Sequence, residues 1–140
     1  MTLVDTSAWV EFLRRTGSNT HRVVRGLLEQ DEPVHTTDVV VMEVLAGARD
    51  EEHHQQLRRL LARCEYLPVQ GLASYEVAAG LYRSCRAAGE TVRALTDCLI
   101  GAVALHFGVS VLHDDRDFDI LARRADVATQ RAEPGDTEQR

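Results

Sequence analysis

Short β-branched runs alternate with longer helical stretches along most of the chain, and this alternation limits the possible folds more than any other feature. Strand-like runs and helical periodicity, each bounded by caps or turn residues, distinguish the two kinds of segment. The expected strands cover residues 2–4, 34–37, 66–69, 109–112 and 127–129. The expected helices cover residues 7–13, 23–28, 38–49, 51–63, 72–88 and 97–107, followed by one through 118–121. This order predicts an α/β fold whose mainly parallel sheet is covered by helices on both faces.

The segment 38–49 is apolar almost all round, which predicts a buried helix, although its Val-rich start could equally form a strand. The length of 140 residues fits one domain with one core. We expect residues 1–130 to form this domain and residues 131–140 to form a disordered tail.

Three features bear on compartment and metal type. The N-terminus lacks the basic start of a signal peptide, and no apolar stretch reaches the roughly 20 residues of a membrane span, so we expect a cytoplasmic protein. Cys64, Cys85 and Cys98 are far apart and form no Cys-x-x-Cys pair, which favours reduced, half-buried thiols. His53 and His54 are adjacent on an expected helix and point to different faces, which argues against zinc.

The net charge of −6 argues against a nucleic acid partner, because phosphate binding depends on clustered positive charge. A metal bound by several acids would remove this objection locally. All 16 basic residues are Arg. Arg binds phosphates in a bidentate way, so Arg14, Arg15, Arg22 and Arg25 could form a binding rim; a solvated helix face explains them equally well.

Three carboxylates occur where the sequence is otherwise apolar. Asp5 ends the first expected strand, Glu43 interrupts the most hydrophobic helix, and Asp97 begins another buried helix. An isolated buried carboxylate is costly unless it is paired or binds a metal. Each also has a structural explanation: Asp5 could cap the following helix, Asp97 could favour the helix dipole, and Glu43 could pair with a buried Arg.

The position of these acids in the expected sheet suggests a shared site. Ligands of open α/β sheets bind at the carboxyl ends of strands, where the strand order reverses. Asp5 follows the first strand and Asp115 follows the strand at 109–112, so both would lie at this edge if the two strands are neighbours. The sequence alone gives no geometry that brings Asp97 there.

Several carboxylates within a few Å repel each other by about 4 kcal/mol per close pair at an effective dielectric near 20, so they need a cation. Oxygen ligands select hard metals, and Mg²⁺ or Mn²⁺ fits a site with few protein ligands. Such a site can activate water against a phosphodiester, with one metal or with two about 4 Å apart. The expected chemistry is phosphodiester hydrolysis.

Four motifs in this order resemble the PIN-domain nucleases, and among them the VapC-type toxins of VapBC toxin–antitoxin modules. They are Val4-Asp5-Thr6-Ser7-Ala8-Trp9, Met42-Glu43-Val44-Leu45-Ala46-Gly47, Thr96-Asp97-Cys98-Leu99-Ile100-Gly101-Ala102 and His113-Asp114-Asp115-Arg116-Asp117-Phe118. The resemblance extends from Leu3 to about Arg124. It implies a three-layer α/β/α sandwich, a metal-dependent endoribonuclease that acts on RNA, a homodimer and a cognate antitoxin protein.

The resemblance also implies the site residues. Asp5, Glu43 and Asp97 match the first three acids of the family. Asp115 and Asp117 both fall in the segment that matches the fourth acid, and we favour Asp115 as the ligand with Asp117 in support. Ser7, and with it Thr6, matches hydroxyls that position an acid or a metal-bound water, although a helix cap explains Ser7 equally well.

Two enzyme classes with similar acid clusters fit less well. A phosphoacceptor receiver domain needs a Lys near a late strand, and this chain has no Lys. A phosphatase with an Asp nucleophile would begin with Asp-x-Asp, whereas Asp5 is followed by Thr6 and Ser7. The remaining alternative is a non-catalytic PIN-like module that binds RNA or protein, and the intact set of acids argues against it.

Overall fold

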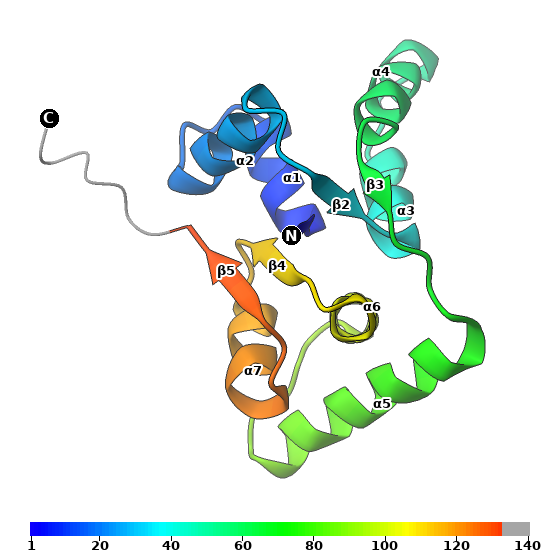
Figure 1. The fold of residues 1–140 in the computed structure, drawn as a ribbon, viewed down its shortest axis with the longest axis vertical. Helices are drawn as coiled ribbons and strands as arrows, with labels where there is room; N and C mark the ends of the chain where they lie inside the picture. The colour runs from blue at the N-terminus through cyan, green and yellow to red at the C-terminus, as the bar shows by residue number, and fades with distance from the viewer. Residues whose placement is uncertain (133–140) are drawn as a thin grey trace, which may run out of the picture.

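The computed structural model describes residues 1–132 and has a five-stranded sheet at its centre (Figure 1). The strands are β1 (Thr2–Val4), β2 (Val34–Thr36), β3 (Glu65–Tyr66), β4 (Ser110–His113) and β5 (Thr129–Arg131). They lie in the order β3-β2-β1-β4-β5, and all four neighbouring pairs are parallel. The prediction of a mainly parallel sheet is therefore confirmed, as is the placement of the first strand beside the late one.

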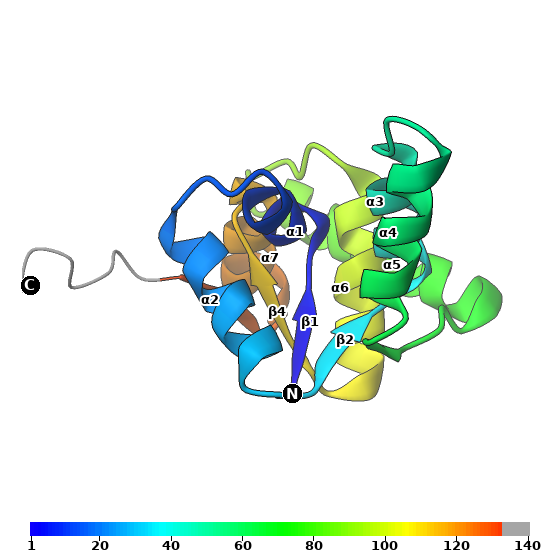
Figure 2. The same ribbon diagram turned by 90° about the horizontal axis from the view of Figure 1, so that it is seen from above.

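Helices cover the sheet on both faces, which completes the predicted α/β/α sandwich. The helices are α1 (Thr6–Leu13), α2 (Asn19–Glu29), α3 (Asp38–Ala46), α4 (Glu51–Leu61), α5 (Gly71–Ala87), α6 (Leu95–Phe107) and α7 (Arg116–Ala125). The two views place α1 and α2 over one face of the sheet and α6 and α7 over the other (Figures 1 and 2). The long helix α5 packs on the outer side of α6 and α7, and α3 and α4 pack together near β2 and β3.

The central strands are buried on both faces, as expected for a covered parallel sheet. Leu3 and Val4 of β1 and Val111 of β4 are 0% exposed, and Leu112 is 1% exposed. Trp9 of α1 and Phe118 of α7 are also fully buried. The strands that carry Asp5 and Asp115 are thus the most rigidly packed part of the molecule.

Several element boundaries differ from the predictions because capping groups act in other places than expected. Asp5, not Ser7, caps α1, since its side chain accepts the backbone N–H of Ser7. Helix α3 is capped at Thr37 rather than Asp38 and is buried only on the side of Val39, Val40 and Val44; Met42 is 59% exposed, so the prediction of a fully buried helix was wrong.

Two further boundaries shift. Helix α6 begins at Leu95, so Thr96 lies inside it and is not its cap; Gly108, at φ +66°, ends it as predicted. The last strand begins at Thr129, and Arg131, which the sequence placed in the tail, is its final residue. The remaining predicted tail, residues 133–140, lies outside the described residues.

Cys85 and Cys98 are buried rather than half-buried, whereas Cys64 is intermediate. In the described part of the chain no helix has the length and apolar character needed to cross a membrane.

Candidate active site

The carboxyl ends of β1 and β4 lie side by side and carry the first and last of the predicted site residues. The backbone N–H of Asp5 donates to the carbonyl of Leu112 over 2.9 Å, which extends the pairing of the two strands to their ends. Asp115 follows β4 directly and caps α7. The strand arrangement proposed from the sequence thus brings Asp5 and Asp115 to the same edge of the sheet.

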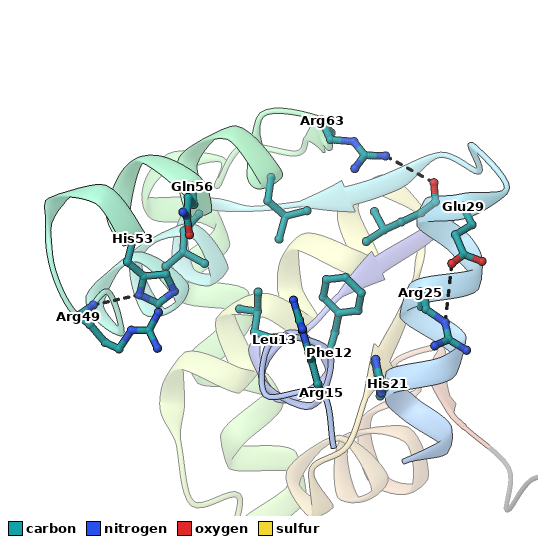
Figure 3. Close-up of a pocket in the computed structure, with 13 residues that line it drawn as sticks. Phe12, Leu13, Arg15, His21, Arg25, Glu29, Arg49, His53, Gln56 and Arg63 are labelled. Carbon is teal, nitrogen blue, oxygen red and sulfur yellow. Dashed lines mark hydrogen bonds and ion pairs between the residues drawn. The ribbon is translucent and has the colours of Figure 1, made fainter. Parts of the chain in front are cut away.

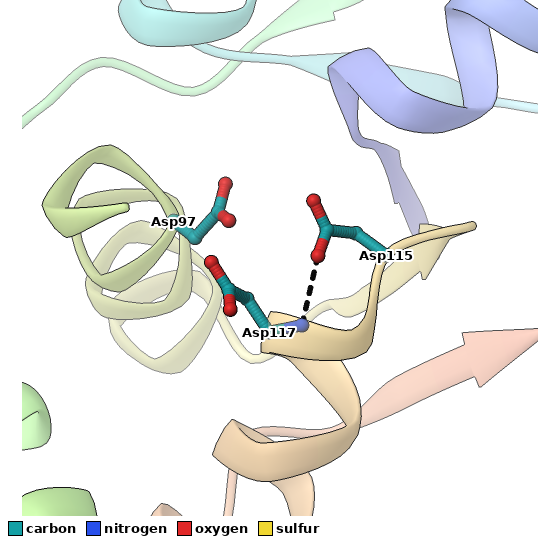
Figure 4. A group of neighbouring side chains, drawn as sticks. All are labelled: Asp97, Asp115 and Asp117. Carbon is teal, nitrogen blue, oxygen red and sulfur yellow. Dashed lines mark hydrogen bonds between the residues drawn. The ribbon is translucent and has the colours of Figure 1, made fainter. Parts of the chain in front are cut away.

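Asp97, Asp115 and Asp117 form a tight group at this edge (Figure 4). Each offers a carboxylate oxygen, and these three oxygens lie within 4.8 Å of one another. The first turn of α6 supplies Asp97, and the loop and first turn after β4 supply the other two. Because α6 leads into β4 through Gly108, the start of the helix lies at the end of the strand. This answers how Asp97 reaches the site.

The environment of Asp97 strongly disfavours its charged form. Burial raises its pKa to about 9, with further contributions from its hydrogen bond to Asp117 and from repulsion by Asp5, Asp115 and Asp117. The favourable dipole of the α6 N-terminus is therefore outweighed. A carboxylate in such a place is ionised at neutral pH only when a cation accompanies it.

Asp5 is 2% exposed and has one satisfied and one unsatisfied oxygen. Its Oδ2 accepts hydrogen bonds from the backbone N–H of Ser7 at 3.0 Å and from the Ser7 hydroxyl at 2.5 Å, whereas its Oδ1 is buried without a partner. Burial raises the pKa of Asp5 to about 6, against the lowering effect of the Ser7 hydrogen bonds. Asp5 therefore caps α1 with one oxygen and leaves the other free for a ligand.

Asp117 differs from its neighbours because the backbone stabilises its charge. Its two oxygens accept the N–H groups of Arg93 and Ala94, each at 3.1 Å, and the Arg93 guanidinium lies 3.8 Å from Oδ1. Although burial opposes it, hydrogen bonds from Asp97, Arg93 and Ala94 lower the pKa of Asp117. Asp117 thus holds the loop that leads into α6. Asp115, by contrast, uses only Oδ1, which accepts the N–H of Asp117 at 2.8 Å.

Glu43 lies at the other side of the cluster and outside the group of three. Its Oε1 accepts the hydroxyl of Thr6 at 2.8 Å, which connects α3 to α1. Glu43 also contributes repulsion to Asp5. Within residues 1–132 it forms no ion pair, so the alternative that Glu43 pairs with a buried Arg was wrong.

Some residues that organise the site were missed by the sequence analysis. Arg93 and Ala94 act through their backbone N–H groups, which carry no sequence signal. Arg131 pairs with Asp114 at 2.9 Å and with Asp119 at 3.1 Å, and this fixes the loop after β4. Its position in the expected tail concealed that role.

The donor set fits a divalent metal. All candidate ligands are carboxylate oxygens, which hard cations prefer. The unpartnered Oδ1 of Asp5 and the repulsion around Asp97 are both unfavourable features that a bound cation would relieve. With the metal absent these groups are under strain, whereas with it they are ligands.

Comparisons with known proteins give one consistent result. The family model described as "PIN domain" matches residues 2–124. Ribonuclease VapC11 of Mycobacterium tuberculosis is 44% identical over 124 residues, which are 88% of this chain and 92% of that protein. Ribonuclease VapC51 of the same organism is 33% identical over 86% of this chain and 84% of its own length.

Among solved structures, VapBC2 from Rickettsia felis bound to a DNA fragment from its promoter superposes with a TM-score of 0.72 at 14% identity, over 93% of this chain and 97% of that one. At these identities the likeness concerns the fold alone, and it agrees with the α/β/α sandwich described above.

Proposed function

The chain belongs to the PIN domain family, and from this membership we propose that it is a VapC-type ribonuclease, the toxin of a toxin–antitoxin pair, which hydrolyses phosphodiester bonds within RNA. The observation that carries the proposal is the convergence of Asp97, Asp115 and Asp117 beside Asp5 at the ends of β1 and β4. The 44% identity to a ribonuclease over nearly the whole domain supports RNA as the substrate class.

We propose Mg²⁺ as the metal, with Mn²⁺ as a substitute, bound by Asp5, Asp97 and Asp115. The bound ion would supply an activated water and neutralise charge on the phosphate. Asp5 would offer its unpartnered Oδ1, and Asp115 has an Oδ2 free of protein hydrogen bonds. Asp97, which retains its proton without a cation, would lose it when the ion binds.

The other acids and hydroxyls hold these ligands in place. Ser7 orients Asp5 through its N–H and hydroxyl. Asp117 supports the site by fixing the start of α6, and hence Asp97, through the N–H groups of Arg93 and Ala94. Glu43, oriented by the hydroxyl of Thr6, lies where it can accept a proton from a metal-bound water or bind a second ion.

We also propose a cognate VapB-type antitoxin as the protein partner, a homodimer as the assembly and the cytoplasm as the location. Several solved structures with this fold are toxin–antitoxin complexes, which supports the antitoxin. Exposed apolar side chains on α3 and α5, such as Met42, Leu72 and Tyr75, offer surface for self-association. Sedimentation of the purified protein would test the dimer.

Cleavage of labelled RNA by the purified protein tests the function. We expect cleavage with Mg²⁺ or Mn²⁺, none with a chelator, and a loss of at least two orders of magnitude in the Asp5→Asn and Asp97→Asn variants. Circular dichroism must show that both variants fold. Full activity of both folded variants would refute the proposal and favour a non-catalytic module.

A further inference from the structure

A groove lined by arginines runs away from the acid cluster. The larger part has a volume of about 810 Å³ and lies between α1, α2 and α4 (Figure 3). A second part, of about 510 Å³, shares Leu13, Arg49, His53 and Leu57 with the first and extends to Thr6 and Glu43. The two parts therefore form one groove that begins at the acid cluster; we refer to them together as the arginine groove.

Positive charge is concentrated in the arginine groove although the protein as a whole carries a net charge of −6. Its cations are Arg14, Arg15, Arg25, Arg49 and Arg63. Glu29 and Glu43 are the acids that line it, and Glu29 is paired with Arg25. The other four arginines form no ion pair with any residue between 1 and 132. Arg22, which the sequence grouped with them, lines neither part.

Two histidines add neutral hydrogen-bond donors to this groove. The Nδ1 of His21 accepts the backbone N–H of Gly17 at 2.9 Å, and the Nδ1 of His53 accepts that of Arg49 at 3.1 Å (Figure 3). With Nδ1 used as an acceptor, the neutral ring carries its proton on Nε2. Each histidine can therefore donate from Nε2 to a phosphate oxygen without being charged.

The floor of the groove is apolar and includes Phe12, Leu28 and Leu60. Proteins that bind single-stranded nucleic acids combine such surfaces, which receive the bases, with cations that follow the backbone. An acidic protein segment with apolar side chains would also match this lining. Continuity with Thr6 and Glu43 favours RNA, because a strand cleaved at the acids must leave them through an adjoining channel.

We propose that the arginine groove binds the RNA strand that flanks the scissile phosphate, with Arg49 and Arg15 contacting backbone phosphates next to the acid cluster and Arg63 contacting one further along. This inference rests on the proposed ribonuclease function. It explains how a chain with an excess of acids and no Lys holds a polyanion: the acids are gathered at the metal, and the arginines are gathered in the channel beside it.

The test measures binding of a fluorescein-labelled single-stranded RNA of about 20 nucleotides, longer than a typical binding site. All proteins carry Asp97→Asn so that the RNA remains intact. Arg15→Gln with Arg49→Gln is compared with Arg59→Gln and Arg83→Gln, two exposed arginines that lie outside the groove and form no ion pair with the described residues. Circular dichroism and thermal midpoints check that both pairs fold.

We expect the groove pair to bind about 25-fold more weakly at 0.1 M salt, because each lost phosphate contact reduces the salt slope by about 0.7. The slope itself should fall by about 1.4, and the control pair should behave like the parent. In the cleaving background the groove pair should raise KM while kcat at saturating RNA is retained. Arg63→Gln should weaken binding of the long RNA more than that of a tetranucleotide.

Equal affinity and slope for both pairs would overturn the groove assignment while cleavage by the wild-type protein left the ribonuclease function intact. If the groove pair lost affinity only for a polyglutamate peptide, the groove would be a site for an acidic protein segment and the proposal would be wrong. If the wild-type protein neither bound nor cleaved RNA with divalent metal, the proposed function and this inference would both fail.

Discussion

The hydroxyl of Ser7 accepts the backbone N–H of Asp114 at 2.9 Å, although 107 residues separate them in the chain. The same hydroxyl donates to Oδ2 of Asp5. Ser7 therefore connects the acid at the end of β1 to the loop that places Asp115 at the end of β4. One side chain fixes the relative position of two proposed ligands that come from opposite ends of the fold.

Replacing Ser7 with Ala should lower RNA cleavage about tenfold or more, because small displacements of catalytic groups reduce rates strongly. Stability should fall by about 1 kcal/mol, the usual value of a lost hydrogen bond. Ser74→Ala is a matched control, since the Ser74 hydroxyl accepts the N–H of Gln70 at 2.7 Å at the start of α5, outside the acid cluster. Equal cleavage by the two variants would show that Ser7 only caps its helix.

Replacing Asp5 with Asn should raise the stability of the metal-free protein at pH 7.5. The pKa of Asp5, raised to about 6, means that its charged form costs folding free energy of about 3 kcal/mol. The buried amide still lacks one partner, so the expected net gain is about 1–2 kcal/mol. Urea unfolding with a chelator measures it, with Asp126→Asn, far from the site at the end of α7, as the control. A loss of stability would assign Asp5 a structural role.

Replacing Asp117 with Asn should have the opposite effect and lower stability, with or without metal. The pKa of Asp117 is lowered, so the fold stabilises its charge. Asn keeps one acceptor oxygen and leaves either the N–H of Arg93 or that of Ala94 without its partner, which costs about 1–3 kcal/mol. Hydrogen exchange at residues 93 and 94 should increase. If Asp117→Asn stabilised the metal-free protein as Asp5→Asn does, Asp117 would be a ligand like the others rather than a support.

The stability of the metal-free protein should fall as pH rises from 6.5 to 8.5. Asp97 has a folded pKa of about 9, above its unfolded value of 3.8, so between these values the folded state binds more protons and loses stability with increasing pH. The slope contributed by Asp97 is at most about 1.4 kcal/mol per pH unit. Burial lowers the pKa of His113, whose opposite effect is confined below this window.

Unfolding curves of the wild type and of Asp97→Asn across this pH range measure the contribution of Asp97, because the thiols titrate alike in both. We expect the variant to be flatter, and saturating Mg²⁺ to flatten the wild type, since the cation stabilises the deprotonated form. Parallel curves for the two proteins would contradict the raised pKa of Asp97.

The sequence predicted those site residues whose own surroundings betray them. Asp5, Glu43 and Asp97 stand in apolar segments, and the neighbouring position of β1 and β4 followed from the rules for parallel sheets. The role of Asp117 could not be predicted, because it depends on the N–H groups of Arg93 and Ala94, which every sequence carries at such positions.

The cap positions and the groove depend on tertiary structure in the same way. Asp5 rather than Ser7 caps α1 because the chain turns directly at the strand end. Arg49 and Arg63 share a groove with Arg15 only because α4 lies across from α1 and α2. Residue type alone does not distinguish them from Arg22, which lines neither part.

The strand order also determines when the enzyme becomes active during its own synthesis. β1 pairs with β4, so the first strand to leave the ribosome waits for one that is made more than a hundred residues later. Asp97, Asp115 and Asp117 emerge later still than most of the core. A nascent or prematurely terminated chain therefore carries Asp5 and Glu43 without a complete metal site, and the cell's translation machinery meets a finished nuclease only after the chain has nearly ended.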